Sequence, residues 1–446
     1  MSTDPRHIAS EVLLRVEKYD AYANISFDAI IMRDDTPVKN RNFAKELVFG
    51  VLRNKSRLEK AVTQFMKRPF AKSHPFVRNQ LLIGAYQILF LDNIPKEIAV
   101  DRAVELVKYE VGKAPCGFVN AVLRNLIRKG EKLPQKENLV EYTGQFYSFP
   151  NWIASILYKA VGEEAPLLAK ALNERSQVNL RTNILKNTRV ELSEKLQKEI
   201  PNIKVQESKL SPYGLRVKGL SDPVRQPLHR QGFYLIQDEA SQLVSIYVDP
   251  QPGEKIMDCC AGTGGKSLHL AALCDNKAEI LAVDRSQSKM DALLQRSKRA
   301  GVNCIDVRED DVLASQFKPD SFDRILLDAP CSGLGVLRRH PEAKWRLQPE
   351  DIKNLADIQS SMLHKMSPVV KPGGVLYYIV CTFNPGETTE IIKNFLKLHP
   401  EFQLEPLPSN KLVKWTEIID KDGFFSILPH KHDSDGFFGA RMRKKS

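Results

Sequence analysis

The sequence lacks several features that would place it in a special class of protein. No run among its 446 residues approaches the length of about 18 apolar residues that a membrane span requires. The first fifteen residues are polar and mixed in charge, without the apolar core or small-residue cleavage site of a secretory signal. Internal repeats and low-complexity segments are also missing. We therefore expect a globular cytoplasmic protein that does not enter a membrane.

Cysteine is present, but not in the patterns of a disulfide framework or a metal site. The chain has 7 cysteines, an odd number, with no C-x-x-C and no Cys/His cluster at zinc-finger spacing. They are Cys116, Cys259, Cys260, Cys274, Cys304, Cys331 and Cys381. We predict reduced thiols, mostly buried, of which one or two are reactive, and no bound metal.

The charge is basic, with 66 Lys and Arg against 54 Asp and Glu and a formal net charge of +12. A basic surplus suits a polyanionic partner such as nucleic acid, because each neutralised phosphate releases counterions. Solubility alone would also account for the surplus, and the charge by itself does not separate the two interpretations.

Hydrophobic periodicity divides the chain into three domains. Residues 1–130 have apolar residues three and four apart, as in 7–16, 43–52 and 100–107, which predicts an all-α domain. A polar linker with Pro134 covers 131–139. Residues 140–235 mix one helical stretch with alternating segments and predict a small α+β module.

In the third domain, residues 236–446, short β-rich runs alternate with helical ones. Four such runs, 255–258, 279–284, 324–328 and 374–380, end at or next to an acidic residue or a cysteine. This pattern predicts a doubly wound α/β domain that binds ligands at the carboxyl ends of its strands.

A glycine-rich turn follows the first of these strands. It contains Cys260, Ala261, Gly262, Thr263, Gly264, Gly265 and Lys266. Such a turn lets the backbone approach a ligand at a helix N-terminus, although a plain tight turn has the same composition. A P-loop would need glycine at Cys260, and a dinucleotide fingerprint would need glycine at Ser267, so neither phosphate-binding pattern is met.

Acidic residues on the following strand ends favour an adenosyl ligand. Asp284 lies 22 residues after Gly262, at the usual reach for ribose hydroxyls. Asp310 or Asp311 ends the third strand, where a carboxylate could accept from an adenine amino group, and Asp328 ends the fourth. Any one of them could instead be a helix N-cap. Together they suit S-adenosylmethionine, whose sulfonium is positive.

Two cysteines occupy strand ends that face the same crevice. Cys331 follows Asp328 and Pro330, and Cys381 ends the strand fifty residues later. Carbon 5 of cytosine is a weak nucleophile until a thiolate adds to C6, and a carboxyl group such as Asp328 could stabilise the adduct. Two thiols at one site would divide attack from release. The alternative is that each thiol only packs, which we expect of Cys116, Cys274 and Cys304.

These motifs resemble those of a known family. The segments Asp328-Ala-Pro-Cys-Ser-Gly333 and Cys381 resemble the RNA cytosine-C5 methyltransferase superfamily. Residues 335–346, 237–242 and 435–438 resemble the bacterial ribosomal RNA small-subunit methyltransferase B family. Residues 101–107 and 118–124 resemble the NusB-like RNA-binding domain that is fused to that family.

The resemblance implies a class I methyltransferase fold preceded by a small RNA-binding subdomain, and methylation of one cytosine in 16S ribosomal RNA. It implies that residues 260–266, Asp284, Asp310 and Asp328 contact S-adenosylmethionine or the target base. It makes Cys381 the nucleophile and Cys331 the residue that helps to release the product. Thr263 stands where the family usually has proline, and Thr388 where it often has asparagine. We expect a monomer.

The sequence leaves two other functions open. The same chemistry could act on transfer RNA or 23S ribosomal RNA, although the NusB-like region argues against this. The chain could also be a non-catalytic RNA-binding assembly factor, against which the two cysteines, Asp328 and the glycine-rich turn all argue.

Overall fold

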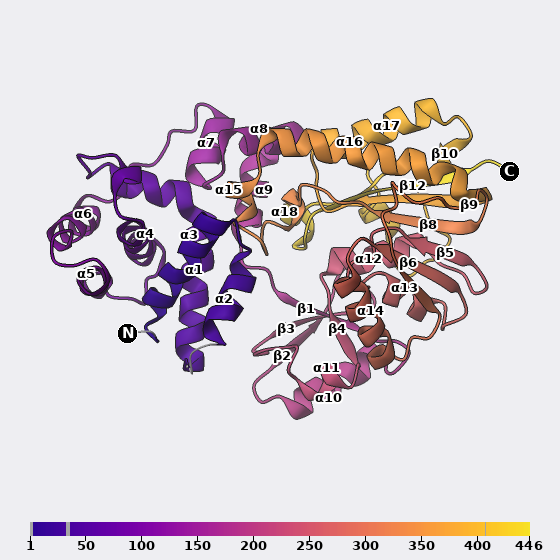
Figure 1. Cartoon of the computed structure of the whole chain (residues 1–446), viewed down its shortest axis with the longest axis horizontal. Coiled ribbons are helices and arrows are strands. Elements are labelled where there is room, and N and C mark those ends of the chain that lie inside the picture. Colours follow the sequence, from indigo (N-terminus) through magenta and orange to yellow (C-terminus); the bar gives the residue numbers. More distant parts are fainter. Residues whose placement is uncertain (1–2, 33–35, 406) are drawn as a thin grey trace. The chain divides into compact units, whose positions relative to one another are not determined.

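The computed structural model describes residues 3–32, 36–405 and 407–446. Within these ranges the chain divides into two compact units (Figure 1). The first unit comprises Met1–Asn173 together with Arg339–Leu347, and the second comprises Glu174–Arg338 with Gln348–Ser446.

The first unit is helical, as predicted for the start of the chain. Its helices are α1 (Pro5–Tyr19), α2 (Ala23–Ile31), α3 (Val38–Thr63), α4 (Pro75–Phe90), α5 (Lys96–Glu110), α6 (Cys116–Lys129), α7 (Leu139–Phe146), α8 (Asn151–Val161), α9 (Ala165–Asn173) and the short α15 (Ala343–Arg346). Helix α1 begins after Asp4, whose side chain accepts from the Arg6 N–H at 2.8 Å, an N-cap that satisfies a free backbone donor. Ile8 and Val12, four residues apart, are buried on its inner face.

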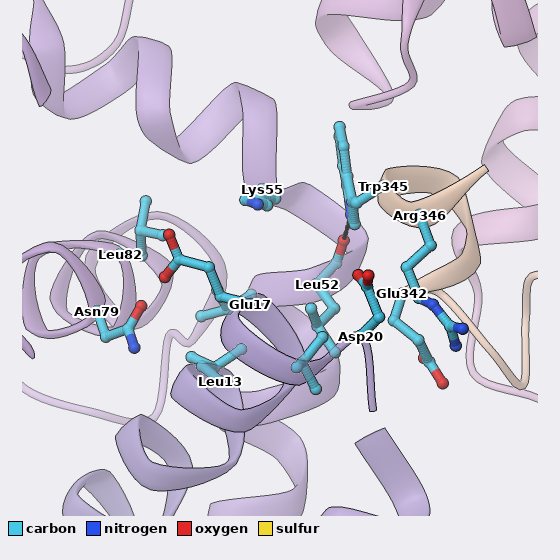
Figure 2. Close-up of a pocket in the computed structure, with 12 residues that line it drawn as sticks. Leu13, Glu17, Asp20, Leu52, Lys55, Asn79, Leu82, Glu342, Trp345 and Arg346 are labelled. Atoms are coloured by element: carbon cyan, nitrogen blue, oxygen red, sulfur yellow. Dashed lines mark hydrogen bonds between the residues drawn. The ribbon is translucent and has the colours of Figure 1, made fainter. Parts of the chain in front are cut away.

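Helix α3 is kinked at Asn54, where φ is −114° and ψ is 16°. Beyond the kink, the Ser56 N–H donates to the Ser148 hydroxyl at 2.9 Å. The indole N–H of Trp345 donates to the carbonyl oxygen of Leu52 at 2.7 Å, the dashed line beside the small cavity of Figure 2. Segment 339–347 is therefore bonded into the helical unit, although the residues on either side of it belong to the second unit.

Lys344 anchors this segment. Its ammonium donates to the carbonyl oxygens of Arg53 at 2.8 Å and Ser148 at 2.9 Å, and to Asn173 Oδ1 at 3.0 Å. The ammonium also lies 4.2 Å from the centre of the Phe149 ring. The side chain is 1% exposed, and this burial lowers the pKa of Lys344 well below its usual value. Three donors meet three acceptors, which offsets the cost of removing the charge from water.

The second unit begins with a small antiparallel sheet in the order β2-β3-β1-β4. Its strands are β1 (Val178–Thr182), β2 (Lys204–Glu207), β3 (Gly214–Lys218) and β4 (Tyr234–Ile236), with helices α10 (Arg189–Glu199) and α11 (Pro227–Arg230). Leu192 and Leu196 of α10 pack on Leu180 and Leu215 of the sheet. An α+β module is therefore present, as predicted, but the helical stretch 140–173 that the sequence assigned to it belongs to the first unit.

A larger, mixed sheet follows, in the order β10-β12-β9-β8-β5-β6-β7, with β11 paired to β12. Its strands are β5 (Lys255–Asp258), β6 (Glu279–Asp284), β7 (Ile305–Glu309), β8 (Phe322–Asp328), β9 (Val370–Val380), β10 (Phe402–Leu404), β11 (Phe425–Ile427) and β12 (Phe437–Lys444). Its helices are α12 (Glu239–Val248), α13 (Ser267–Leu273), α14 (Gln287–Ala300), α16 (Pro349–Met366), α17 (Thr389–Leu398) and α18 (Pro429–His432). Strands β5 to β9 pair in parallel, and β12 is antiparallel to β9.

Helices cover both faces of this sheet, α16 and α17 on one and α12 and α13 on the other (Figure 1). Successive side chains of a strand point to opposite faces of the sheet. On β9, Tyr377 packs in the apolar cluster that includes α12 and α13, and its neighbour Tyr378 packs in the cluster that includes α16 and α17. Because β5 pairs with both β6 and β8, the strand order reverses at β5. The doubly wound fold is thus confirmed, and a crevice is expected outside the carboxyl ends of β5 and β8.

Candidate active site

The glycine-rich turn lies at this reversal point. The Gly262 N–H donates to Asp284 Oδ2 at 3.0 Å, which ties the turn to the end of β6. Gly264 has a φ of +84°, and a Cβ there would lie 2.4 Å from Leu293 Cγ in α14. Only glycine fits this position without strain, because both the backbone conformation and the space exclude a side chain.

A cavity of about 410 Å³ opens at the carboxyl ends of β5, β6 and β8. It is lined by Cys259, Cys260, Gly262, Asp284, Arg285, Ser286, Lys289, Asp310, Asp311, Val312, Asp328, Pro330 and Met362. Five of the predicted cofactor residues are in this lining: Cys260, Gly262, Asp284, Asp310 and Asp328. Asp311 lines it too, so the choice between Asp310 and Asp311 stays open.

The other predicted cofactor residues shape the turn rather than line the cavity; they are Ala261, Thr263, Gly264, Gly265 and Lys266. Thr263 Oγ1 accepts from Arg296 at 2.7 Å, and the Gly265 carbonyl oxygen accepts from Arg181 at 2.5 Å. Arg181 comes from β1 of the small sheet, and complete burial lowers its pKa to about 9. The small sheet therefore holds the glycine-rich turn, a role that nothing in the sequence around Arg181 indicates.

Burial sets the protonation of two groups beside the turn. It raises the pKa of Asp258, whose Oδ2 accepts from Ser267 at 2.6 Å, to about 6. It also raises the pKa of Cys260 to about 12. Cys260 is therefore a thiol near neutral pH and a poor nucleophile. At Asp310, hydrogen bonds from Ser315 and the charge of Arg308 lower the pKa, so this carboxylate stays ionised in the cavity wall.

The two strand-end cysteines lie together, with Cys331 Sγ 3.2 Å from Cys381 Sγ. Cys331 follows β8 and Cys381 follows β9, neighbouring parallel strands, and both thiols are partly buried. The hydrogen bond to Cys381, and then burial, raise the pKa of Cys331 well above its usual value. Cys331 thus keeps its proton near neutral pH and can donate it to Cys381.

Lys266 faces the reacting groups. Its Nζ lies 2.5 Å from Asp328 Oδ2, and the ammonium lies 5.5 Å from the centre of the Phe437 ring. Burial lowers the pKa of Lys266, but the charge and the hydrogen bond of Asp328, together with the charge of Asp258, outweigh that effect and the net shift is upward. Lys266 is therefore a cation paired with Asp328, a position that the sequence alone does not reveal.

Two further observations concern metal sites and membrane spans. In the ranges that the structure describes, no group of three or more His, Cys, Asp or Glu residues could hold a metal ion. Among the described helices, none is long and apolar enough to cross a membrane.

Five parallel strands, β5 to β9, in this order, with a glycine-rich turn at the reversal point and carboxylates on the strand ends, define a methyltransferase domain. Comparison with known families agrees. The family described as 16S rRNA methyltransferase RsmB/F matches residues 245–443, the NusB family matches 3–128, and the RsmF/B-like ferredoxin-like domain matches 149–222.

Relatives span the whole chain. It is 34% identical over 98% of its length to the probable ribosomal RNA small subunit methyltransferase B of Synechocystis sp., covering 99% of that protein. Identity to the protein of the same name from Bacillus subtilis is 34%, over 99% of each chain. A solved methyltransferase homolog from Pyrococcus horikoshii has a TM-score of 0.58 and 26% identity, covering 69% of this chain and 99% of its own. The solved structure of PH0851 has a TM-score of 0.80 and 25% identity, covering all of both chains. The chain belongs to the ribosomal RNA small subunit methyltransferase B family.

Proposed function

We propose that this protein transfers a methyl group from S-adenosylmethionine to carbon 5 of a cytosine in 16S ribosomal RNA. The observation that carries the proposal is the pair of thiols 3.2 Å apart, next to the strand that ends in Asp328. The relatives are named for the small-subunit ribosomal RNA, and we extend that substrate to this chain.

The cavity fits the proposed cofactor. Its volume of about 410 Å³ lies in the range of small-molecule sites. Asp284 would accept from the ribose hydroxyls and Asp310 from the adenine amino group, while the carboxylates in its wall suit a cationic ligand better than a phosphate. When bound, S-adenosylmethionine supplies an electrophilic methyl group.

In the proposed reaction, the Cys381 thiolate forms a bond to C6 of the cytosine, and the displaced electron pair moves toward C5. Asp328, held by Lys266, lies at the ring nitrogen or amino group and stabilises the adduct. C5 takes the methyl group, a base removes the C5 proton, and the bond between C6 and sulfur breaks. Cys331 retains its proton near neutral pH and so can protonate the departing Cys381.

Cysteine variants and sequencing test the proposal. Bisulfite sequencing of ribosomal and transfer RNA from cells without this protein should show that one 5-methylcytosine is lost, and that it is located in 16S RNA. Cys381→Ser should abolish transfer, and Cys331→Ala should accumulate a covalent RNA–protein complex that survives denaturing electrophoresis. Full activity of Cys381→Ser, or a lost signal in transfer RNA alone, would contradict the mechanism or the substrate respectively.

A further inference from the structure

Behind the two cysteines lies a buried carboxylate that the reaction does not use. Glu387 is 0% exposed and belongs to a 3₁₀ turn, Pro385–Glu387, that follows the Cys381 strand. A buried carboxylate is costly unless its oxygens are fully hydrogen-bonded. What Glu387 binds therefore indicates why the fold retains it.

Four donors surround it, two on each oxygen. Oε1 accepts from the Ser332 N–H at 2.8 Å and from Gln359 Nε2 at 3.1 Å. Oε2 accepts from the Ser332 hydroxyl at 2.6 Å and from Asn384 Nδ2 at 3.3 Å. Because every partner can donate, the set matches an acceptor-only carboxylate.

Two of these partners, Ser332 and Asn384, sit on the two cysteine loops. Ser332 directly follows Cys331, and its hydroxyl lies 3.0 Å from the hydroxyl of Thr382, which directly follows Cys381. Through Ser332, Thr382 and its own place in the chain, Glu387 joins the loop after β8 to the loop after β9.

Helix α16 and strand β9 complete the network. Gln359 Nε2 also donates to the Pro330 carbonyl oxygen at 2.8 Å, one residue before Cys331. The Tyr378 hydroxyl lies 3.0 Å from Gln359 Oε1 and 2.6 Å from the Glu387 carbonyl oxygen. Gln359, Tyr378 and Thr382 are each 0% exposed, so water does not compete for these bonds.

We propose that Glu387 is a positioning residue that fixes the Cys331 and Cys381 loops so that the two thiols stay in contact. Glu387 touches neither thiol. It holds the two loops through Ser332 and Thr382, and its charge also raises the pKa of Cys331. The proposal rests on the proposed cysteine chemistry. Misplacing a reacting group by about 1 Å can cost on the order of 100-fold in rate, so loosening either loop should lower turnover more than substrate binding.

Glu387→Gln tests this, because it keeps the shape but turns one acceptor oxygen into an NH₂ group that faces donors. We expect kcat to fall roughly 10- to 100-fold, with the RNA KM and the calorimetric affinity for S-adenosylmethionine within about threefold. Ser332→Ala should lower kcat in the same way, and the double variant should lose less than the product of the two losses. The matched control is Glu254→Gln, which weakens the ion pair with Arg324 at the amino ends of β5 and β8, away from the two cysteine loops.

A second measurement does not depend on the RNA substrate. Iodoacetamide labelling of the free protein, read by mass spectrometry, gives the ratio of the alkylation rates of Cys331 and Cys381. We expect this ratio to change at least threefold in Glu387→Gln and also in Ser332→Ala, which keeps the charge of Glu387 but removes the Ser332 hydroxyl bond to it. It should not change in Glu254→Gln. An unchanged ratio, a kcat within twofold of wild type, or a loss explained by a smaller folded fraction would overturn the proposal. If Glu387→Gln does not fold, the kcat and the alkylation ratio of Ser332→Ala test the proposal by the same thresholds.

The two proposals fail separately. Wild-type protein that does not methylate carbon 5 of cytosine would refute the proposed function, whereas the labelling ratio would still decide whether Glu387 positions the thiols.

Discussion

Lys344→Met should destabilise the helical unit, although position 344 lies inside the segment that matches the methyltransferase family. The change removes an ammonium from three acceptors: the carbonyl oxygens of Arg53 and Ser148, and Asn173 Oδ1. Each acceptor left unpaired costs about 1–3 kcal/mol. Relief from burying a charge offsets several kcal/mol, and methionine fills a similar volume. The expected net loss is about 3 kcal/mol in the stability of the first unit.

Hydrogen exchange read by mass spectrometry can assign this loss to one unit. A loss of about 3 kcal/mol speeds exchange roughly 150-fold where opening of the unit governs it. Peptides from α3 in the first unit should show this acceleration, and peptides from β9 in the second should not. Lys45→Met, an exposed position on the same helix, is the control and should leave both unchanged.

Equal protection of α3 in Lys344→Met and wild type would refute the reasoning. So would acceleration confined to β9, since segment 339–347 would then stabilise the second unit instead of the first.

Three further predictions concern the methyltransferase domain. Burial raises the pKa of Asp258 from 3.8 to about 6. The folded protein therefore binds this proton more tightly than the unfolded chain does, and the resulting stabilisation is complete below pH 3.8 and is lost as the pH rises through about 6. Asp258→Asn should therefore gain up to about 3 kcal/mol relative to wild type between about pH 3.5 and pH 7.5, measured as the pH dependence of the difference in denaturant midpoint. Gly264→Ala places a Cβ against Leu293 and should weaken S-adenosylmethionine binding at least tenfold by calorimetry. Lys266→Met leaves Asp328 without its ammonium and should slow methylation at least tenfold, with cofactor affinity within about threefold.

Each of these has an outcome that would contradict it. If the difference in denaturant midpoint between Asp258→Asn and wild type does not vary with pH, Asp258 has the same pKa in the folded and the unfolded protein, which would contradict the prediction. Gly117→Ala, in open space on α6, is the control for Gly264→Ala, and equal affinities in the two variants would contradict the steric argument. A loss of cofactor binding in Lys266→Met would assign Lys266 to the cofactor instead of Asp328.

The fold could be predicted because its signals are local. Apolar residues three and four apart specify helices, and short β-rich runs between helices specify a parallel sheet. Since parallel strands end at one edge, the sequence alone was enough to expect Asp284, Asp328, Cys331 and Cys381 at one crevice. Their catalytic and binding roles stay predictions, which the proposed variants test.

The Lys266–Asp328 pair, the hold of Arg181 on the glycine-rich turn and the Glu387 network could not be predicted in this way. Each joins residues far apart in the chain through side-chain hydrogen bonds, and such bonds leave no periodic trace in the sequence. Glu387 and Lys344 are also residue types that usually stay in water, so composition predicts them at the surface.

The sequence by itself determined the helical and α/β organisation and the residue types at the strand ends, because apolar periodicity and glycine-rich turns act over a few residues. Only the tertiary structure decided that segment 339–347 belongs to the helical unit, and that the thiols of Cys331 and Cys381 touch in front of a buried carboxylate. Burying Lys344 and Glu387 is possible only where carbonyl oxygens or donors from distant segments converge to satisfy every hydrogen bond, and that convergence exists only in the folded chain.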